Sequence, residues 1–292
     1  MQLILFLLII FSLSAQIPKV TYTFSTEPID VVIPYHPKDF ETIELCIKGI
    51  RENGKNVRRI IVISDKPYTT SAEWFDENSY PFSKADVALE IFHGDQEKAT
   101  EFLTHPKTRI GWIFQQLLKL YAASVIPNIS SNVLILDADV IYFKPTDFID
   151  PSGQPYFLPG TNDTKEYFEH AAKLLNGLHR VYPDKSGIVH HMLFQRPILD
   201  DLFHLISLQH QTEAWRAICR CVDLNEIYKS CLSEYEIYFN FVMQRTTQRT
   251  LRRLHWTEVV PNLSNLSYYQ RAGYVFIASQ EWYRKWIAEM MK

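Results

Sequence analysis

The sequence predicts one α/β domain built on a mostly parallel sheet that is flanked by helices. Short apolar runs rich in β-branched residues alternate with segments of helical periodicity, which is the order of elements in such sheets. The chain has 292 residues, 47% of them hydrophobic and 22% charged, so it can bury a sizeable core. No internal repeat, low-complexity tract or linker interrupts residues 17–292, and we expect a single domain there.

Three segments have the pattern of strands that are buried on both faces. They are residues 29–34 (IDVVIP), 59–64 (RIIVIS) and 133–136 (VLIL). Each is a nearly continuous run of apolar, mostly branched residues, and each is followed at once by polar residues or by proline. These runs predict three parallel strands.

Two segments between these strands have helical periodicity. Residues 39–53 place Ile43, Ile47 and Ile50 on one face, together with Phe40. Residues 108–125 show the strongest helical pattern of the chain, with apolar residues at intervals of three and four behind the possible N-cap Thr108. The second helix also carries a polar edge, which includes Gln116 and Lys119.

The ends of the three predicted strands nominate one site. In open α/β sheets the ligand binds at the carboxyl ends of the strands. Tyr35 and His36 follow the first strand, Asp65 follows the second, and Asp137-Ala138-Asp139 follows the third. We therefore expect these side chains to meet at one edge of the sheet.

Asp137 and Asp139 form the first candidate for chemistry. Two carboxylates one residue apart at a strand end can both reach a hard divalent cation, which in turn binds the oxygens of a diphosphate. A pair of aspartates with this spacing arises about once by chance in a chain of this aspartate content. The spacing alone is therefore weak evidence for a metal site, and the position of the pair directly after a buried strand is the stronger evidence. The alternative is a pair of strand-end acids that cap a helix or face solvent.

Composition excludes several classes of function. Thirty Lys and Arg against 33 Asp and Glu give a formal charge of -3, which leaves no basic field for nucleic-acid binding. The chain has nine glycines and contains neither G-x-G-x-x-G nor G-x-x-x-x-G-K. We therefore expect no nucleic-acid partner and no glycine-rich phosphate loop.

The N-terminus has the pattern of a signal peptide or an N-terminal anchor over residues 1–16. Residues 3–13 are apolar except for Ser12, and small residues follow. The run is shorter than the ~20 residues of a membrane-spanning helix. We expect a protein of the secretory pathway or a membrane-associated protein, with residues 3–15 as the possible point of membrane association.

The cysteines do not have the spacing of a metal site. Cys219, Cys221 and Cys231 lack the paired C-x-x-C arrangement of zinc sites, and Cys46 lies far away in the sequence. Buried thiols are the default interpretation, with one disulfide within residues 219–231 if the compartment is oxidising.

Four segments in order resemble the GT-A-type glycosyltransferases of the nucleotide-diphospho-sugar transferase superfamily, in particular an uncharacterised branch. VLILDADVIYFKP is similar to the metal-binding D-x-D segment, and SGIVHHMLF (residues 186–194) to the glycine-containing loop that follows it. SEYEIYFNF (residues 233–241) resembles the acidic motif that supplies a catalytic carboxylate, and TRIGWIFQQLLKLY resembles the helix of that branch. The resemblance covers roughly residues 29–256.

The resemblance implies a GT-A-like, Rossmann-type sheet and a hexosyltransferase-like enzyme. It would use Mn²⁺ or Mg²⁺ and a nucleotide-sugar donor; the acceptor, whether glycan, lipid or protein, is not predicted. The implied metal ligands are Asp137, Asp139 and the late histidine His255. The implied catalytic carboxylates are Glu234 and Glu236. The implied donor-binding residues are Pro34, Tyr35, His36, Asp65, Arg109, Trp112, Gln116, Lys119, Asp137, Ala138, Gly187, His190 and His191.

The residues of the later motifs also have interpretations of their own. Ser233 followed by Glu236 has the spacing of a capping box, which favours Glu234 in the first helical turn as the general base. Gly187 could let the backbone approach a sugar or a phosphate. His190 and His191 are adjacent and point in different directions, so we expect at most one to face the site.

Two other functions remain open from the sequence. One is a secreted carbohydrate-binding or catalytically inactive transferase-like module, which would need neither Glu234 nor a metal. The other is a phosphatase of the D-x-D type, with the first aspartate as nucleophile. Its aspartates would follow the first strand and be succeeded by a threonine. Here they follow the third predicted strand, and Tyr142-Phe143 comes instead.

Overall fold

A five-stranded sheet forms the centre of the computed structural model, which describes residues 16–259, 265–280 and 289–290. The strand order is β3-β2-β1-β4-β7. The strands are β1 (Ile29–Pro34), β2 (Val57–Ser64), β3 (Glu73–Asp76), β4 (Asn132–Leu136) and β7 (His191–Gln195). The β3–β2, β2–β1 and β1–β4 pairs are parallel, and β7 is antiparallel to β4. The predicted α/β domain with a mostly parallel sheet is confirmed.

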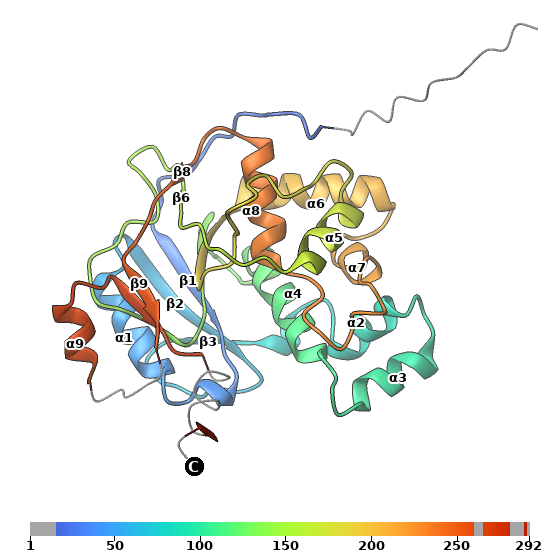
Figure 1. The fold of residues 1–292 in the computed structure, drawn as a ribbon, viewed down its shortest axis with the longest axis horizontal. Coiled ribbons are helices and arrows are strands. Elements are labelled where there is room, and N and C mark those ends of the chain that lie inside the picture. The colour runs from blue at the N-terminus through green and yellow to red at the C-terminus, as the bar shows by residue number, and fades with distance from the viewer. Residues whose placement is uncertain (1–15, 260–264, 281–288, 291–292) are drawn as a thin grey trace, which may run out of the picture.

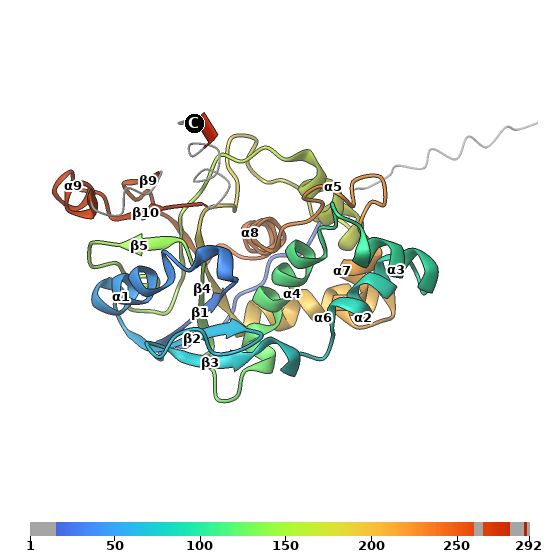
Figure 2. The ribbon, with the colours of Figure 1, turned by 90° about the horizontal axis from the view of Figure 1, so that it is seen from below.

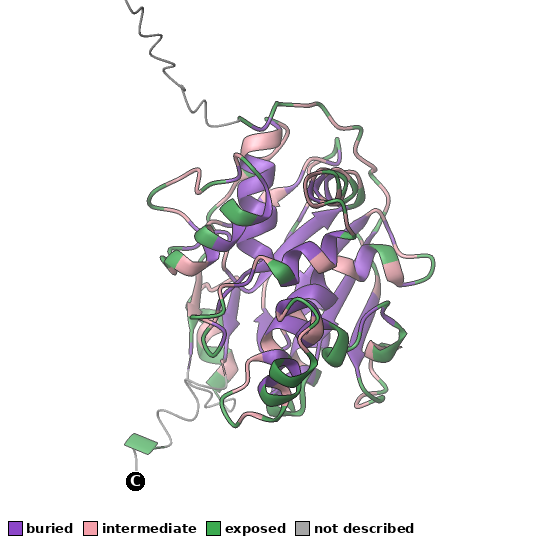
Figure 3. Ribbon diagram, turned by 90° about the vertical axis from the view of Figure 1, so that its right-hand side faces the viewer, coloured by how far each residue is buried: buried purple, intermediate pink, exposed green. Residues whose placement is uncertain are grey.

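Helices cover both faces of this sheet, which explains why its strands are apolar on both sides (Figures 1 and 2). Val31 and Ile33 of β1 pack with α1 (Ile43–Asn53) in one apolar core. Val32 packs into the second and larger core on the opposite face. The helices of that face include α4 (Ile110–Val125), α6 (Arg196–His210) and α8 (Glu234–Arg245). Burial follows these layers, with buried strands inside and exposed residues on outer turns (Figure 3).

The remaining elements lie around this central unit. The other helices are η1 (Pro37–Asp39), η2 (Glu77–Ser79), α2 (Lys84–Ile91), α3 (Gln96–Thr104), α5 (Lys165–Leu174), α7 (Ala214–Arg220) and α9 (Leu266–Arg271). A small sheet has the order β5-β10-β9, formed by β5 (Val140–Tyr142), β10 (Phe276–Ala278) and β9 (Trp256–Glu258). A parallel pair joins β6 (Tyr156–Phe157) and β8 (Thr250–Leu251). The small sheet brings residues from the end of the chain beside the D-x-D segment.

The predicted elements agree with the structure except at their ends and in one motif. The first helix begins at Ile43 rather than at residue 39, because Pro37 opens a short 3-10 turn and leaves Phe40 exposed. Part of the motif expected to be a glycine loop is strand β7, which starts at His191. This strand was missed because its first residue is polar and it follows a glycine by only four positions.

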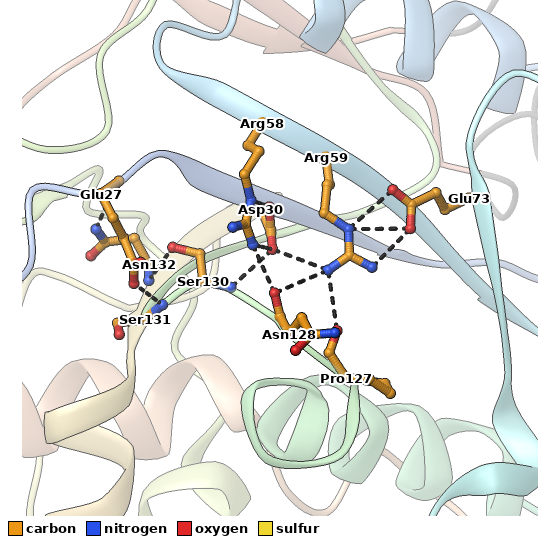
Figure 4. A network of polar contacts seen from close by, with 10 residues as sticks. All are labelled: Glu27, Asp30, Arg58, Arg59, Glu73, Pro127, Asn128, Ser130, Ser131 and Asn132. Carbon is orange, nitrogen blue, oxygen red and sulfur yellow. Dashed lines mark hydrogen bonds and ion pairs between the residues drawn. The ribbon is translucent and has the colours of Figure 1, made fainter.

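A network of polar contacts lies at the amino ends of the strands (Figure 4). The predicted site lies at their carboxyl ends. Asp30 is fully buried in β1, where it accepts two hydrogen bonds from Arg58 at 2.9 and 2.6 Å and one from the backbone of Ser130 at 2.9 Å. Arg59 pairs with Glu73 of β3 at 2.8 Å. A buried carboxylate is tolerated when it is paired and hydrogen-bonded in this way. The charged residues at this edge of the sheet therefore stabilise the fold by pairing with one another.

Two predictions concern the N-terminus and the cysteines. The expected signal peptide or anchor covers residues 1–16, of which residues 1–15 lie outside the described residues. Within the part of the chain that is described, no helix has both the length and the apolar character needed to cross a membrane. The disulfide expected within residues 219–231 under oxidising conditions is not formed, since Cys219, Cys221 and Cys231 are free thiols in the structure.

Candidate metal centre and active site

A cavity of about 450 Å³ opens at the carboxyl ends of β1 and β4. The loop before β7, the N-terminus of α8 and one side of α4 complete its wall. Apart from the aspartates and histidines, six of the predicted donor-binding residues line this cavity: Pro34, Ala138, Arg109, Trp112, Gln116 and Lys119. A cavity therefore lies at the ends of two of the three predicted strands.

The D-x-D segment and one histidine form a cluster of possible metal ligands. Asp137 and Asp139 lie in the turn that follows β4, and His190 lies just before β7. The antiparallel pairing of β4 with β7 brings the two segments together, and the backbone N–H of Asp137 donates to the carbonyl of His190 at 3.0 Å. One ligand atom from each of these three side chains lies within 4.8 Å of the others.

The two aspartates differ in their partners. Asp137 lies 2.7 Å from the ammonium of Lys119 and 3.7 Å from Nδ1 of His190. Burial raises the pKa of Asp137, but these two cations outweigh burial and lower the pKa below its usual range. In Asp139, Oδ1 is buried and has no hydrogen-bond partner among the described residues. Burial and the nearby charge of Asp137 raise the pKa of Asp139 to about 6, against the favourable effect of His190.

The unpartnered oxygen of Asp139 fits a divalent cation. A buried carboxylate oxygen without a donor is costly unless an ion or a proton satisfies it. Two carboxylates and an imidazole are ligands that suit Mn²⁺. Mg²⁺ also binds carboxylate oxygens but prefers sites with fewer nitrogen ligands. The arrangement can therefore hold a divalent ion with open positions towards the cavity.

A buried lysine links the metal cluster to the predicted general base. Lys119 of α4 lies 2.8 Å from Oε1 of Glu234, the first residue of α8, and its ammonium lies 4.5 Å from the centre of the Tyr235 ring. Burial lowers the pKa of Lys119, but Asp137 and Glu234 outweigh it and raise the pKa well above its usual value. Burial raises the pKa of Glu234, and Lys119 opposes that rise. Asp137, Lys119 and Glu234 thus form one row of alternating charge, in which Lys119 and Glu234 are buried and Asp137 is partly exposed to the cavity.

Glu236, the second predicted catalytic carboxylate, faces away from the cavity and braces the neighbouring loop. It accepts hydrogen bonds from the Ser186 hydroxyl, from the backbone of Gly187 at 3.1 Å and from Asn240 at 2.9 Å. Half of the predicted capping box is present, because the Ser233 hydroxyl accepts from the backbone of Glu236 at 3.3 Å. The geometry therefore favours Glu234, and gives Glu236 a structural position.

Gly187 is required by helix packing rather than by close approach of a ligand. A Cβ at this position would lie 2.5 Å from the Cβ of Phe239 and 2.5 Å from the carbonyl oxygen of Tyr235, both in α8. This contact corrects the expectation that Gly187 approaches a sugar or a phosphate. The glycine lets the loop pack directly on α8, next to His190.

The two adjacent histidines divide as expected, with one facing the site. His191 is buried among the rings of Tyr142, Phe148 and Phe276, and burial lowers its pKa to about 3. His190 lines the cavity. His191 is therefore a neutral core residue and not a donor-binding residue.

Four other predicted residues do not line the cavity. Tyr35 packs on the ring of Tyr68, with 5.0 Å between ring centres, and His36 caps the 3-10 turn by accepting from the backbone of Lys38 at 3.3 Å. Asp65 is also absent from the cavity wall. The structure does not bring His255 into the metal cluster, because its ring stacks on Tyr274 at 4.1 Å.

Glu258 is a functional candidate that sequence reasoning missed. Its Oε1 lies 3.6 Å from Nε2 of His190, while Nδ1 of the same ring faces Asp137. Burial lowers the pKa of His190, but Asp137, Glu258 and Asp139 outweigh burial and raise the pKa to about 9. A metal-binding histidine commonly donates its other N–H to a carboxylate, which fixes the ring orientation. The sequence gives no signal for this contact, because Glu258 is brought to His190 by the pairing of short strands in the small sheet.

Replacing Glu258 with Gln is expected to weaken Mn²⁺ binding about 10- to 100-fold, the usual cost of losing such an outer partner. Titration calorimetry with Mn²⁺ would measure the dissociation constant. Glu52→Gln on the exposed face of α1 is the matched control and should bind as the wild type does. Equal affinities for Glu258→Gln and the wild type would show that Glu258 does not orient a ligand.

The comparisons with known proteins give a family and, among the solved structures, distant fold neighbours. The model of DUF6492, described as a family of unknown function, matches residues 24–289. None of the curated proteins compared matches the chain. Among solved structures, the chain is similar to the apo form of mouse xyloside xylosyltransferase 1, with 10% sequence identity and a TM-score of 0.42, over 87% of this chain and 97% of that chain. A likeness at that level carries no argument about function. The family match covers most of the chain, and the protein therefore belongs to the DUF6492 family of unknown function.

Proposed function

We propose that this protein is a metal-dependent glycosyltransferase that moves a sugar from a nucleotide-diphosphate sugar to an acceptor hydroxyl. The observation that carries the proposal is the Asp137, Asp139 and His190 cluster in the same cavity as Glu234. The cluster supplies ligands for a divalent ion, and the cavity supplies a carboxylate at a helix N-terminus. A metal that neutralises the departing diphosphate and a base that takes the acceptor's proton are the two groups that metal-dependent transfer by a single displacement uses.

In this proposal Asp139, Asp137 and His190 would hold Mn²⁺ or Mg²⁺, which when bound neutralises charge on the departing diphosphate. Glu234 takes the proton of the acceptor hydroxyl. The acceptor oxygen forms a bond to the anomeric carbon as the bond from that carbon to the diphosphate oxygen breaks. Lys119 keeps Asp137 and Glu234 at a fixed separation, since it lies 2.7 Å from one and 2.8 Å from the other. A single displacement of this kind inverts the anomeric centre.

The D-x-D phosphatase alternative is less consistent with the site. Its first aspartate must act as a nucleophile. Asp137 is held instead in an ion pair with Lys119 and a second contact with His190. The location in the secretory pathway or at a membrane stays part of the proposal, because it would place the enzyme where glycans are assembled.

The test is the binding and slow hydrolysis of a panel of nucleotide sugars by the purified full chain, with Mn²⁺ and with EDTA. We expect donor binding that requires the metal, and hydrolysis that Glu234→Gln lowers by roughly 100-fold or more while it leaves donor and Mn²⁺ binding in place. A folded protein that binds no nucleotide in either condition would contradict the proposal. Activity that persists in Glu234→Gln would show that another group is the base.

A further inference from the structure

One side of α4 lines the cavity over a greater length than a metal-bound diphosphate needs. Arg109, Trp112, Gln116 and Lys119 are spaced by three or four residues and all contribute to the cavity wall. Lys119 contacts Asp137 of the metal cluster. Arg109 lies ten residues earlier, which corresponds to about 15 Å along a helix axis. This separation exceeds the length of a diphosphate, so the Arg109 end of the cavity can contact a group other than the donor's phosphates.

Arg109 has no anionic partner among the residues that the structure describes. Its Nη2 donates to the Ser230 hydroxyl at 2.8 Å, and its guanidinium lies 5.1 Å from the centre of the Trp112 ring. Its Nε is buried and makes no hydrogen bond within the described residues. Most other half-buried arginines in the described ranges, such as Arg59 and Arg245, are paired with a carboxylate. Arg109 is therefore a cation in a cavity with neutral contacts and unused hydrogen-bonding capacity.

The surroundings of Arg109 have the chemistry of a sugar subsite. The Trp112 indole is held by its own hydrogen bond, from Nε1 to the carbonyl of Leu232 at 3.3 Å, so the orientation of the ring beside the Arg109 guanidinium is fixed. Ser230, which contacts Arg109, adds a hydroxyl group, and Asn162 and Tyr167 add further neutral polar groups to the cavity wall. A flat aromatic ring together with amide and hydroxyl groups suits a pyranose, and the planar guanidinium matches the two oxygens of a carboxylate.

We propose that the Arg109 end of the cavity binds an acidic sugar, such as a uronic acid, as the acceptor. One guanidinium can balance one carboxylate but not a phosphate dianion. Of the other cations in the described cavity wall, Lys119 is paired with Asp137 and Glu234, and Lys38 interacts electrostatically with Asp139. The assignment of the acidic sugar as the acceptor rests on the proposed transferase function. The existence of a carboxylate subsite at Arg109 does not.

The test compares uronic-acid-terminated disaccharides with their carboxyl-reduced, neutral counterparts, with no metal and no nucleotide added. The panel covers glucuronate, galacturonate, mannuronate and iduronate termini, with glucose 6-phosphate as the phosphate probe. We expect the full-length wild type to bind at least one acid about 10- to 100-fold tighter than its neutral partner, as measured by ligand-observed NMR. Arg109→Gln should abolish that preference, and Arg109→Lys should restore part of it.

Arg271→Gln, at the exposed end of α9, is the matched control and should keep the preference. The proposal is overturned if no acid of the panel is preferred, if the preference survives Arg109→Gln, or if glucose 6-phosphate binds in place of the uronic acids. It is also overturned if Arg109→Gln changes instead the choice between a nucleotide-linked uronic acid and its neutral analogue, because the anion would then belong to the donor.

The outcomes also separate this inference from the proposed function. Metal-dependent donor binding with no acid preference would keep the transferase and remove the acidic subsite. An Arg109-dependent acid preference without any donor binding would keep the subsite and remove the transferase. Unfolding curves of each variant check that lost binding is not lost structure.

Discussion

Replacing Lys119 with Met is expected to lower the free energy of unfolding by about 3–5 kcal/mol at pH 7, because it leaves a buried carboxylate without its counter-charge. Methionine keeps most of the length of the side chain but removes the ammonium. Glu234 is almost fully buried and has its ion pair with Lys119 at 2.8 Å. Asp137 would also lose its partner at 2.7 Å. The two carboxylates would then repel each other at the centre of the site.

Urea unfolding followed by circular dichroism would measure this loss. Lys173→Met is the matched control, since Lys173 pairs with Asp223 at 3.2 Å where both side chains are about half exposed. Such a surface pair contributes about 0–1 kcal/mol. Adding Glu234→Gln to Lys119→Met should recover part of the stability, because it removes the uncompensated charge. If Lys119→Met cost no more than Lys173→Met, the row of charges would not be a stabilising arrangement.

The parts of the fold that sequence patterns predicted are those with local causes. The three buried strands are continuous apolar runs, and β1, β2 and β4 lie within two residues of their predicted bounds. The stripe of Arg109, Trp112, Gln116 and Lys119 follows from helical spacing alone, and all four line the cavity. Parallel strands place their ends at one edge of the sheet, so the position of the D-x-D segment could also be predicted.

The parts that could not be predicted depend on pairings between distant segments. His190 reaches Asp137 because β7 lies antiparallel to β4, and Glu258 reaches His190 through the short strand β9. Strands of three to five residues with polar members leave no clear pattern in the sequence. The place of His255 in the chain predicts a metal ligand, but its ring stacks on Tyr274. Glu258, three residues later, is the residue that lies beside the cluster.

Asp139→Asn is expected to weaken Mn²⁺ binding by more than the 10- to 100-fold expected for Glu258→Gln, because Asp139 is a direct ligand. In EDTA, where no metal is bound, the same substitution is expected to stabilise the protein. The Asp139 pKa of about 6 in the folded state is above the ordinary value of 3.8, so ionisation of Asp139 opposes folding at pH 7. The shift corresponds to about 1–3 kcal/mol of stability that the asparagine regains. The gain should shrink as the pH falls below 6 and vanish below about pH 4, where the wild-type carboxyl group is protonated in both the folded and the unfolded state.

Asp137→Asn separates the roles of the two carboxylates. Lys119 and His190 lower the pKa of Asp137, so its charge stabilises the fold. Its removal should therefore lower the free energy of unfolding, whereas Asp139→Asn raises it.

Thermal unfolding in EDTA and in saturating Mn²⁺ would measure both effects, because a ligand that binds the folded state raises the midpoint of unfolding. Wild type should gain stability from Mn²⁺ and Asp139→Asn should not. An Asp139→Asn protein that is less stable than wild type in EDTA, or that Mn²⁺ still stabilises, would contradict the assignment. Opposite signs for two carboxylates one residue apart follow from their partners: Asp137 is already neutralised by the protein, and Asp139 is left for the metal.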